Sequence, residues 1–243
     1  MPEKHLSSQF DSELNGVSTR VMEMGGLVES QIRHAIYALS QFSLESVDQV
    51  LAIEERVNAM EVEIDHDLST IIARRQPTAR DLRLLLAFSK ATANLERMGD
   101  EASKMARMVR SIIEGGAPRS LPTGDLRLAA DLASGQLRKA LDAFARLDVK
   151  MAVAILKEDD LIDQEFGGFV RKLITYMMED ARTISPSLDL LFLAKAIERI
   201  GDHSKNIAEL IIYLVKGMDV RHTSQHLLLQ LSGLIPVSAG ILS

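Results

Sequence analysis

The chain has 243 residues, of which 47% are hydrophobic and only 4% aromatic, with eleven methionines and no tryptophan. This composition favours helices packed on aliphatic side chains over β-sheets, so we expect an all-α protein. A formal net charge of −6 argues against a nucleic-acid partner, and the lack of cysteine excludes disulfides, thiolate zinc sites and cysteine nucleophiles.

The N-terminus is polar from Met1 to His5 and lacks the apolar core of an export signal. The sequence contains no run of about 18 consecutive apolar residues, the length needed to span a bilayer as a helix. We therefore expect a cytoplasmic protein without direct membrane insertion.

A glycine- and proline-rich segment divides the chain, because these residues end one helix and prevent another from starting. The predicted organisation is a first three-helix bundle over 1–114, a linker over 115–124, a second three-helix bundle over 125–217 and a tail over 218–243.

The two halves resemble each other. Residues 31–36 match residues 136–141 at a spacing of 105, whereas residues 96–100 match residues 198–202 at a spacing of 102. An internal duplication follows, with one inter-helix loop three residues shorter in the second half.

Apolar residues recur at alternating steps of three and four in each half, which predicts three long amphipathic helices. Such regular seams pack at shallow angles, so we expect two tandem antiparallel three-helix bundles. Pro77-Thr78 and Ser185-Pro186 are predicted to supply an N-cap hydroxyl and a break before the third helix of each half, and Lys216-Gly217 to end the last helix.

Carboxylates interrupt the apolar seam of the middle helices. Glu54 and Glu61 do so in the first half, and Asp159 stands at the position equivalent to Glu54. A buried, unpaired carboxylate is costly, so each such side chain needs a cation, a hydrogen-bond donor or an exposed position.

Acidic residues also pair at a spacing of four, which places both side chains on one helical face. Two such pairs per half, on neighbouring helices, could surround a hard cation such as Mg²⁺, Mn²⁺ or iron with oxygen ligands. Surface ion pairs with Arg97, Lys104 and Arg199 are the alternative. The candidate ligands are Glu54, Asn58, Glu96, Asp100, Asp159, Asp163, Glu198 and Asp202.

Two glycines, Gly99 and Gly201, stand inside strong helix patterns and are expected to permit close approach of a helix or ligand. Glu63 to His66 has the Glu-x-x-His pattern of di-iron bundles, so a ferritin-like metal-storage or di-iron-type protein is the alternative function. The pattern is not repeated, because the equivalent residues are Gly168 and Arg171. No nucleophile elbow or phosphate-binding loop occurs, so the sequence offers no support for nucleophilic catalysis.

The two E-R-x-G-D motifs at residues 96–100 and 198–202 strongly resemble the twin signatures of the PhoU family. Residues 21–26, 75–83 and 176–180 also resemble segments of that family, and the similarity runs from about Phe10 to Gly217. The resemblance implies a homodimeric, non-enzymatic protein that binds multinuclear metal clusters through the E/D-x-x-x-D motifs.

The resemblance also implies a function. Family members restrain phosphate import and repress the phosphate-starvation regulon, beside the ATPase subunit of the phosphate ABC transporter and its sensor histidine kinase, at the inner face of the membrane. Two residues depart from the pattern: Asn58 replaces a carboxylate, and Lys104 stands where the second half has Asn206. Both departures predict weaker cation binding in the first half than in the second.

Overall fold

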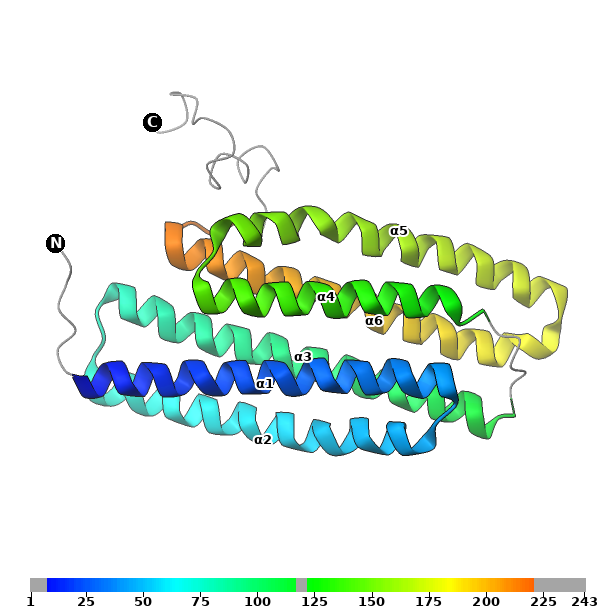
Figure 1. Ribbon diagram of the computed structural model, residues 1–243, viewed down its shortest axis with the longest axis horizontal. Helices are drawn as coiled ribbons and strands as arrows, with labels where there is room; N and C mark the ends of the chain where they lie inside the picture. Colours follow the sequence, from blue (N-terminus) through cyan, green and yellow to red (C-terminus); the bar gives the residue numbers. More distant parts are fainter. Residues whose placement is uncertain (1–7, 117–121, 221–243) are drawn as a thin grey trace, which may run out of the picture.

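The computed structural model describes residues 8–116 and 122–220, except for the side chains of residues 8 and 159–161 (Figure 1). This part of the chain is helical and contains no strand, which confirms the predicted all-α fold. The elements are α1 (Ser8–Gln41), α2 (Leu44–Arg75), α3 (Ala79–Glu114), α4 (Gly124–Arg146), α5 (Val149–Glu179), the 3₁₀ helix η1 (Ala181–Thr183) and α6 (Ile184–Lys216). Half of the predicted linker, residues 117–121, and most of the predicted tail, residues 221–243, lie outside the described residues.

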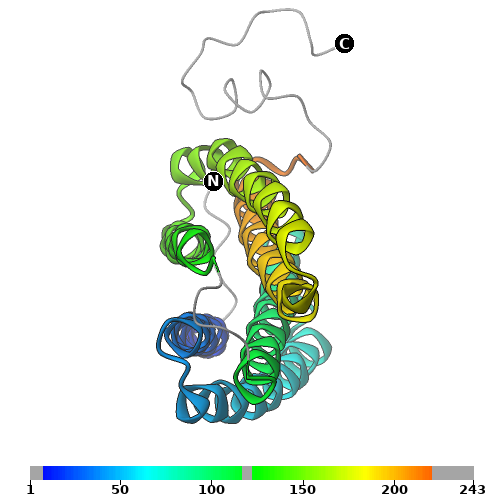
Figure 2. The same ribbon diagram turned by 90° about the vertical axis from the view of Figure 1, so that its right-hand side faces the viewer.

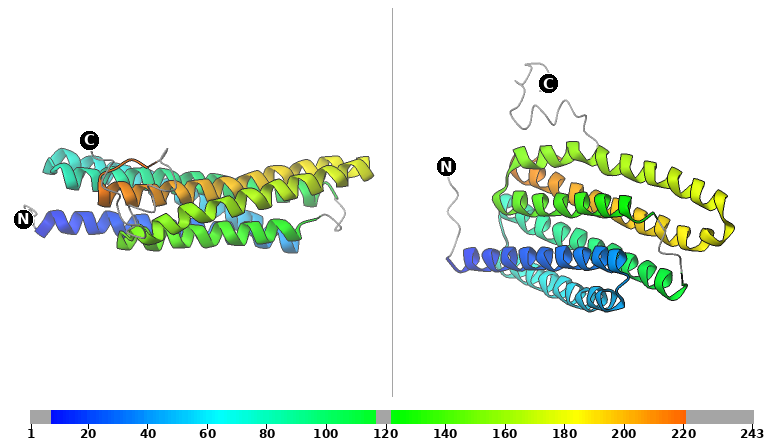
Figure 3. Two further views of the ribbon diagram at one scale, coloured as in Figure 1. Left: turned by 90° about the horizontal axis from the view of Figure 1, so that it is seen from above. Right: turned by 45° about the vertical axis from the view of Figure 1, so that its right-hand side comes forward.

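Helices α1 to α3 pack against one another as one three-helix bundle, and α4 to α6 form the second. The bundles lie side by side, with α3 and α6 sharing the most extensive helix interface (Figure 2). Helices α2, α3, α6 and α5 form a curved layer, and α1 and α4 lie next to each other on one side of it (Figure 3). A single hydrophobic core therefore extends through both halves.

The turns between the first two helices of each half are duplicates in detail. Phe42 and Leu147 occupy equivalent positions and both have a φ of 53°. The next residues, Ser43 and Asp148, are N-caps whose side chains accept a hydrogen bond from the backbone amide three residues later, at 3.2 Å and 3.1 Å. Because N-cap acceptors satisfy otherwise unpaired amides, α2 and α5 begin at equivalent residues.

The shorter loop of the second half lies between α5 and α6. Arg75 aligns with Asp180 at the spacing of 105, and Ala79 aligns with Ala181 at the spacing of 102. Residues 76–78 of the first half therefore have no counterpart. The second half must reverse its chain direction with almost no connecting residues.

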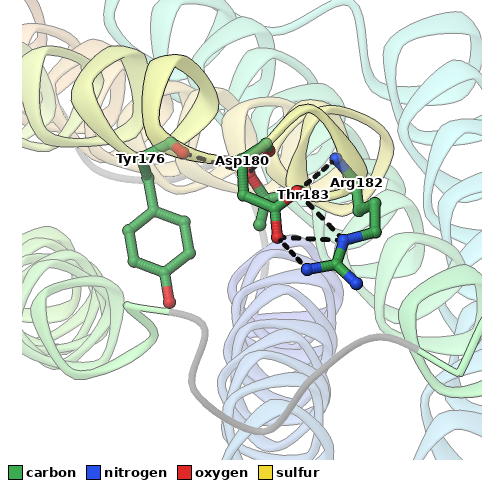
Figure 4. A network of polar contacts seen from close by, with 4 residues as sticks. All are labelled: Tyr176, Asp180, Arg182 and Thr183. Carbon is green, nitrogen blue, oxygen red and sulfur yellow. Dashed lines mark hydrogen bonds and ion pairs between the residues drawn. The ribbon is translucent and has the colours of Figure 1, made fainter.

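A network of hydrogen bonds makes this tight turn possible (Figure 4). The Asp180 carboxylate accepts bonds from the amide and the guanidinium of Arg182, both at 2.9 Å, and these bonds hold the pKa of Asp180 below its usual value. The hydroxyl of Thr183 donates to the carbonyls of Asp180 at 2.7 Å and Tyr176 at 3.1 Å. The network satisfies carbonyls at the end of α5 directly before α6 starts.

The starts of the third helices differ from the prediction. Thr78 is the N-cap of α3, but its hydroxyl bonds Asp81 Oδ2 at 3.2 Å and makes no capping bond to a backbone amide. Helix α6 begins at Ile184, so Ser185-Pro186 lies inside its first turn, where the amide that proline lacks would have no partner. Gly217 ends α6 as predicted, with a φ of 70°.

Helices α3 and α6 run antiparallel in a defined register. The polar contacts that join them include Asn94–Asn206 (3.1 Å), Glu101–Arg199 (3.1 Å) and Ser111–Asp189 (2.8 Å). The residue numbers sum to 300 in each pair. Since equivalent residues differ by 102, this register places Gly99 opposite Gly201, and a pseudo-two-fold axis passes between the two signature motifs.

Close contacts also join α4 to the first bundle. A Cβ atom at Gly25 would lie 2.6 Å from Leu141 Cδ2, so glycine allows this leucine of α4 to pack on the backbone of α1. Arg138 Nε donates to Glu29 Oε1 at 3.0 Å across the same helix pair. These contacts hold the bundles together on the side opposite the curved layer.

Candidate metal centre

The first-half carboxylates gather between α2 and α3. Glu54 comes from α2, whereas Glu96 and Asp100 come from α3, and the charge of Asp100 acts on both glutamates. Glu61, two helical turns beyond Glu54 in the same seam, belongs to the same group because its charge acts on Glu96. Asn58 is exposed. The structure therefore brings three of the four predicted first-half residues together and adds Glu61.

A buried glutamine of α1 supports this group from inside the bundle. Gln31 is fully buried, and its Nε2 lies 2.6 Å from Glu54 Oε2, 3.1 Å from the Gly99 carbonyl and 3.1 Å from Ser103 Oγ. This amide provides the donor that a half-buried carboxylate requires. Sequence reasoning missed the role of Gln31, although its repetition as Gln136 on a buried face was the available signal.

Gly99 makes room for the carboxylate. A Cβ atom at this position would lie 2.9 Å from Glu54 Oε2 and 3.1 Å from Gln31 Oε1. At Gly201, the equivalent atom would lie 2.9 Å from Ile162 Cδ1 and 3.3 Å from Gln136 Oε1. Both glycines thus allow side chains of neighbouring helices to reach the backbone of α3 or α6, as the sequence predicts.

The three glutamates of this group have raised pKa values. Burial raises the pKa of Glu54 above its usual 4.5, and the charge of Asp100 raises it further, while the bond from Gln31 partly opposes the shift. Burial followed by the charges of Asp100, Glu61 and Glu54 raises the pKa of Glu96. The pKa of Glu61 is also raised, by burial and then by Asp65. A group of this kind gains from a bound cation, which would offset the repulsion.

Replacing Glu54 with glutamine should therefore stabilise the metal-free protein at neutral pH. Below the unfolded pKa of about 4.5 the carboxyl is neutral in both states and imposes no penalty. As the pH rises through the raised folded pKa, ionisation destabilises the folded state, and the glutamine variant avoids this loss. Urea unfolding in chelator should show an advantage for Glu54→Gln at pH 7 that disappears near pH 4. An advantage independent of pH would contradict the prediction.

The second-half residues are less completely assembled. Glu198 is mostly buried and its Oε2 lies 2.5 Å from Lys195 Nζ, while Asp163 and Asp202 are exposed. The side chain of Asp159 lies outside the described residues. Gln136 donates to the Ile155 carbonyl at 3.4 Å, as Gln31 does to the equivalent carbonyl of Val50.

The sequence left open that Arg97, Lys104 and Arg199 form ion pairs with the candidate ligands. Two of these three cations pair with a different residue. Arg199 Nη1 and Lys104 Nζ both pair with Glu101, at 3.1 Å and 2.9 Å, and Glu101 is almost fully buried at the α3–α6 interface. His203 Nδ1 lies 3.0 Å from Asn94 Oδ1 in the same interface, and burial lowers the pKa of His203. The charge of Arg97 acts on the candidate ligand Glu96, where it opposes a small part of the rise in pKa that burial causes.

The Glu-x-x-His pattern does not face the bundle. Glu63 and His66 are exposed, whereas Ile64 between them is fully buried. A di-iron site requires both side chains to project into the core. Their exposure argues against such a site at this position.

The donor set around Glu54 and Glu198 is made of carboxylates and suits a hard cation. Three buried oxygens beside the two motifs make no well-aligned hydrogen bond within the described residues: Gln31 Oε1, Gln136 Oε1 and Glu198 Oε2. Among the described side chains, however, no three acidic or histidine residues converge closely enough to hold a metal ion as they stand. Binding would require rotation of the exposed or half-buried carboxylates toward the ion.

A cavity of about 700 Å³ lies away from these carboxylates, beside the α5–α6 turn and the end of α3. Tyr176, Glu179 and Asp189 are among its lining residues, and none of the predicted metal ligands is. Within the described part of the chain, no helix combines the length and the apolarity needed to cross a bilayer.

Known proteins resemble this chain in sequence and in structure. The profile of the PhoU domain matches residues 21–109 and 126–211, one match in each half. A "Phosphate-specific transport system accessory protein PhoU homolog" of Burkholderia sp is 48% identical over 231 residues, which cover 95% of this chain and 98% of the relative. The "Phosphate-specific transport system accessory protein PhoU" of Escherichia coli (strain K12) is 47% identical over 220 residues, 90% of each chain.

The fold agrees with these relationships. The crystal structure of PhoU from Pseudomonas aeruginosa superposes with a TM-score of 0.83 and 42% sequence identity, covering 86% of this chain and all of that one. Two domain matches, relatives aligned over nearly their whole length and a matching solved fold all lead to the same assignment. The chain belongs to the PhoU family.

Proposed function

We propose that this chain is a negative regulator of phosphate uptake and of the phosphate-starvation regulon. The observation that carries the proposal is the match to phosphate-specific transport accessory proteins across both halves of the chain. We infer that it acts as a cytoplasmic homodimer, as an adaptor between the ATPase subunit of a phosphate ABC transporter and a sensor histidine kinase. We assign it no catalytic step.

We further propose that the adaptor binds Mg²⁺, Mn²⁺ or iron through its carboxylates. Support comes from the half-buried group of Glu54, Glu61, Glu96 and Asp100, in which the raised pKa values of the three glutamates and the oxygen donors are those expected of a hard-cation site. In this role the residues would hold the ion, and Gln31 would orient Glu54. The bound ion would supply positive charge that joins α2 to α3.

Cells that lack this chain should express alkaline phosphatase even in phosphate-rich medium. Restoring the wild type should repress the enzyme, whereas Glu198→Gln with Asp202→Asn should fail to repress it, because the second-half site would lose two carboxylates. Alkaline phosphatase activity and protein level are measured together. The matched control is Glu45→Gln with Glu114→Gln, which removes two exposed glutamates near the far ends of their helices.

Each result has a defined meaning. Full repression by a stably expressed double variant would show that the second-half carboxylates are dispensable for regulation. No change in alkaline phosphatase on deletion of the chain would contradict the regulatory role itself.

A further inference from the structure

The two halves differ at two equivalent positions next to their motif glutamates. Glu61 of α2 corresponds to Phe166 of α5 at the spacing of 105, and Ala93 of α3 corresponds to Lys195 of α6 at the spacing of 102. The first half therefore has an additional carboxylate where the second half has an aromatic ring. The second half also has an additional cation where the first half has a methyl group.

In the second half the two replacements touch each other and the motif. Lys195 Nζ lies 2.5 Å from Glu198 Oε2 and 5.4 Å from the centroid of the Phe166 ring. The face of an aromatic ring attracts an ammonium group, so Phe166 helps to hold Lys195 over Glu198. The first half has Ala93 at the position of Lys195, and Glu61 adds negative charge beside Glu96 that the charge of Arg97 offsets only in part.

The ion pair engages a carboxylate of the second-half motif. The Glu198 side chain is 14% exposed and Lys195 is 49% exposed, so the ammonium reaches from solvent onto a largely buried carboxylate. Glu198 Oε2 makes no well-aligned hydrogen bond within the described residues, so the ammonium acts on it as a point charge. Such a contact leaves the lone pairs of this oxygen available to an ion that displaces the lysine.

We propose that Lys195 is a tethered cation that competes with the metal ion for Glu198 and makes the second-half site the weaker of the two. This inference rests on the metal-binding function proposed above. From Asn58, the sequence predicts weaker cation binding in the first half than in the second, and this inference reverses that order. Glu61 restores the negative charge that Asn58 lacks in the first half, while Lys195 cancels one negative charge in the second. The second-half site then fills only at higher metal concentration, after the ammonium has moved into solvent.

The test measures Mn²⁺ binding to the second-half site alone. Glu96→Gln with Asp100→Asn disables the first half, and free Mn²⁺ is followed by its electron paramagnetic resonance signal during titration. In this background Lys195→Met should tighten Mn²⁺ binding about 5-fold, the size expected when a partly exposed ion pair no longer competes. Lys216→Met is the matched control, since it removes the same charge from the exposed end of α6.

The reciprocal experiment introduces the competitor into the first half. In protein disabled by Glu198→Gln with Asp202→Asn, Ala93→Lys should weaken Mn²⁺ binding by a similar factor. Position 93 is exposed, so the new side chain has room and folding should not change. Circular dichroism verifies the fold of each variant.

The outcomes separate this inference from the function on which it rests. Lys195→Met and Lys216→Met proteins with equal Mn²⁺ affinity would overturn the role of Lys195 while leaving metal binding intact. The same conclusion follows if disabling the first half abolishes Mn²⁺ binding and Lys195→Met does not restore it. A wild-type protein that binds no Mn²⁺ would overturn the proposed metal function and the inference together.

Discussion

Glu96→Gln combined with Asp100→Asn is expected to weaken metal binding at the first-half site by about 100-fold or more. These residues supply the α3 side of the carboxylate group, while Glu54 and Glu61 supply the α2 side. Amide oxygens are neutral and hold a hard cation far less strongly than carboxylates. Isothermal titration with Mn²⁺, in protein carrying Glu198→Gln and Asp202→Asn, measures the first-half site directly.

The same titration includes a matched control. Glu45→Gln with Glu114→Gln removes two negative charges from exposed positions of α2 and α3. This control should bind Mn²⁺ as the parent does, because screening weakens the effect of distant surface charges. Equal weakening in both variants would indicate that Mn²⁺ responds only to net charge, and the predicted site would be rejected.

Glu101→Gln is expected to reduce the free energy of unfolding by about 2 kcal/mol. Glu101 is 3% exposed and pairs with Lys104 of its own helix and with Arg199 across the α3–α6 interface. Without the negative charge of Glu101, the positive charges of Lys104 and Arg199 would repel each other, because the carboxylate that pairs with both of them beside His203 would be gone. The expected loss is below that of a fully buried pair, because both cations are almost half exposed.

Urea denaturation at low and high salt tests this expectation. The loss should shrink in high salt, which screens the repulsion among the remaining cations. Glu114→Gln makes the same chemical change at the exposed end of α3 and should leave stability unchanged within about 0.5 kcal/mol. A loss of equal size in the control, or one independent of salt, would show that Glu101 does not act through these ion pairs.

The sequence was most informative where the determining interactions are local. Helix positions follow from apolar periodicity, and Gly217 ends α6 because glycine adopts the left-handed conformation easily. The start of α6 was placed incorrectly because Ser185-Pro186 resembles a helix boundary, although proline is also accepted within the first turn. The sequence does not show how α5 ends; the structure shows that the hydrogen bonds of Asp180 and Thr183 end it at the shortened turn.

The candidate site was predicted in part. Glu54, Glu96 and Asp100 were found because their spacing puts them on predictable helical faces. Glu61 stood in the same seam with Asp65 four residues later, but its equivalent in the second half is Phe166, so the repeated acidic pairs did not single it out. The metal itself, and the arrangement around Asp159, stay predictions.

By itself, the sequence determined that this chain is a duplicated all-α protein with a carboxylate pair in each third helix, because periodicity, breakers and repeats are properties of neighbouring residues. Only the tertiary structure decided that the bundles lie side by side in the α3–α6 register, that Gln31 reaches Glu54, and that Lys195 lies over Glu198. These contacts join different helices, and amphipathic periodicity identifies a buried face without identifying the helix that covers it.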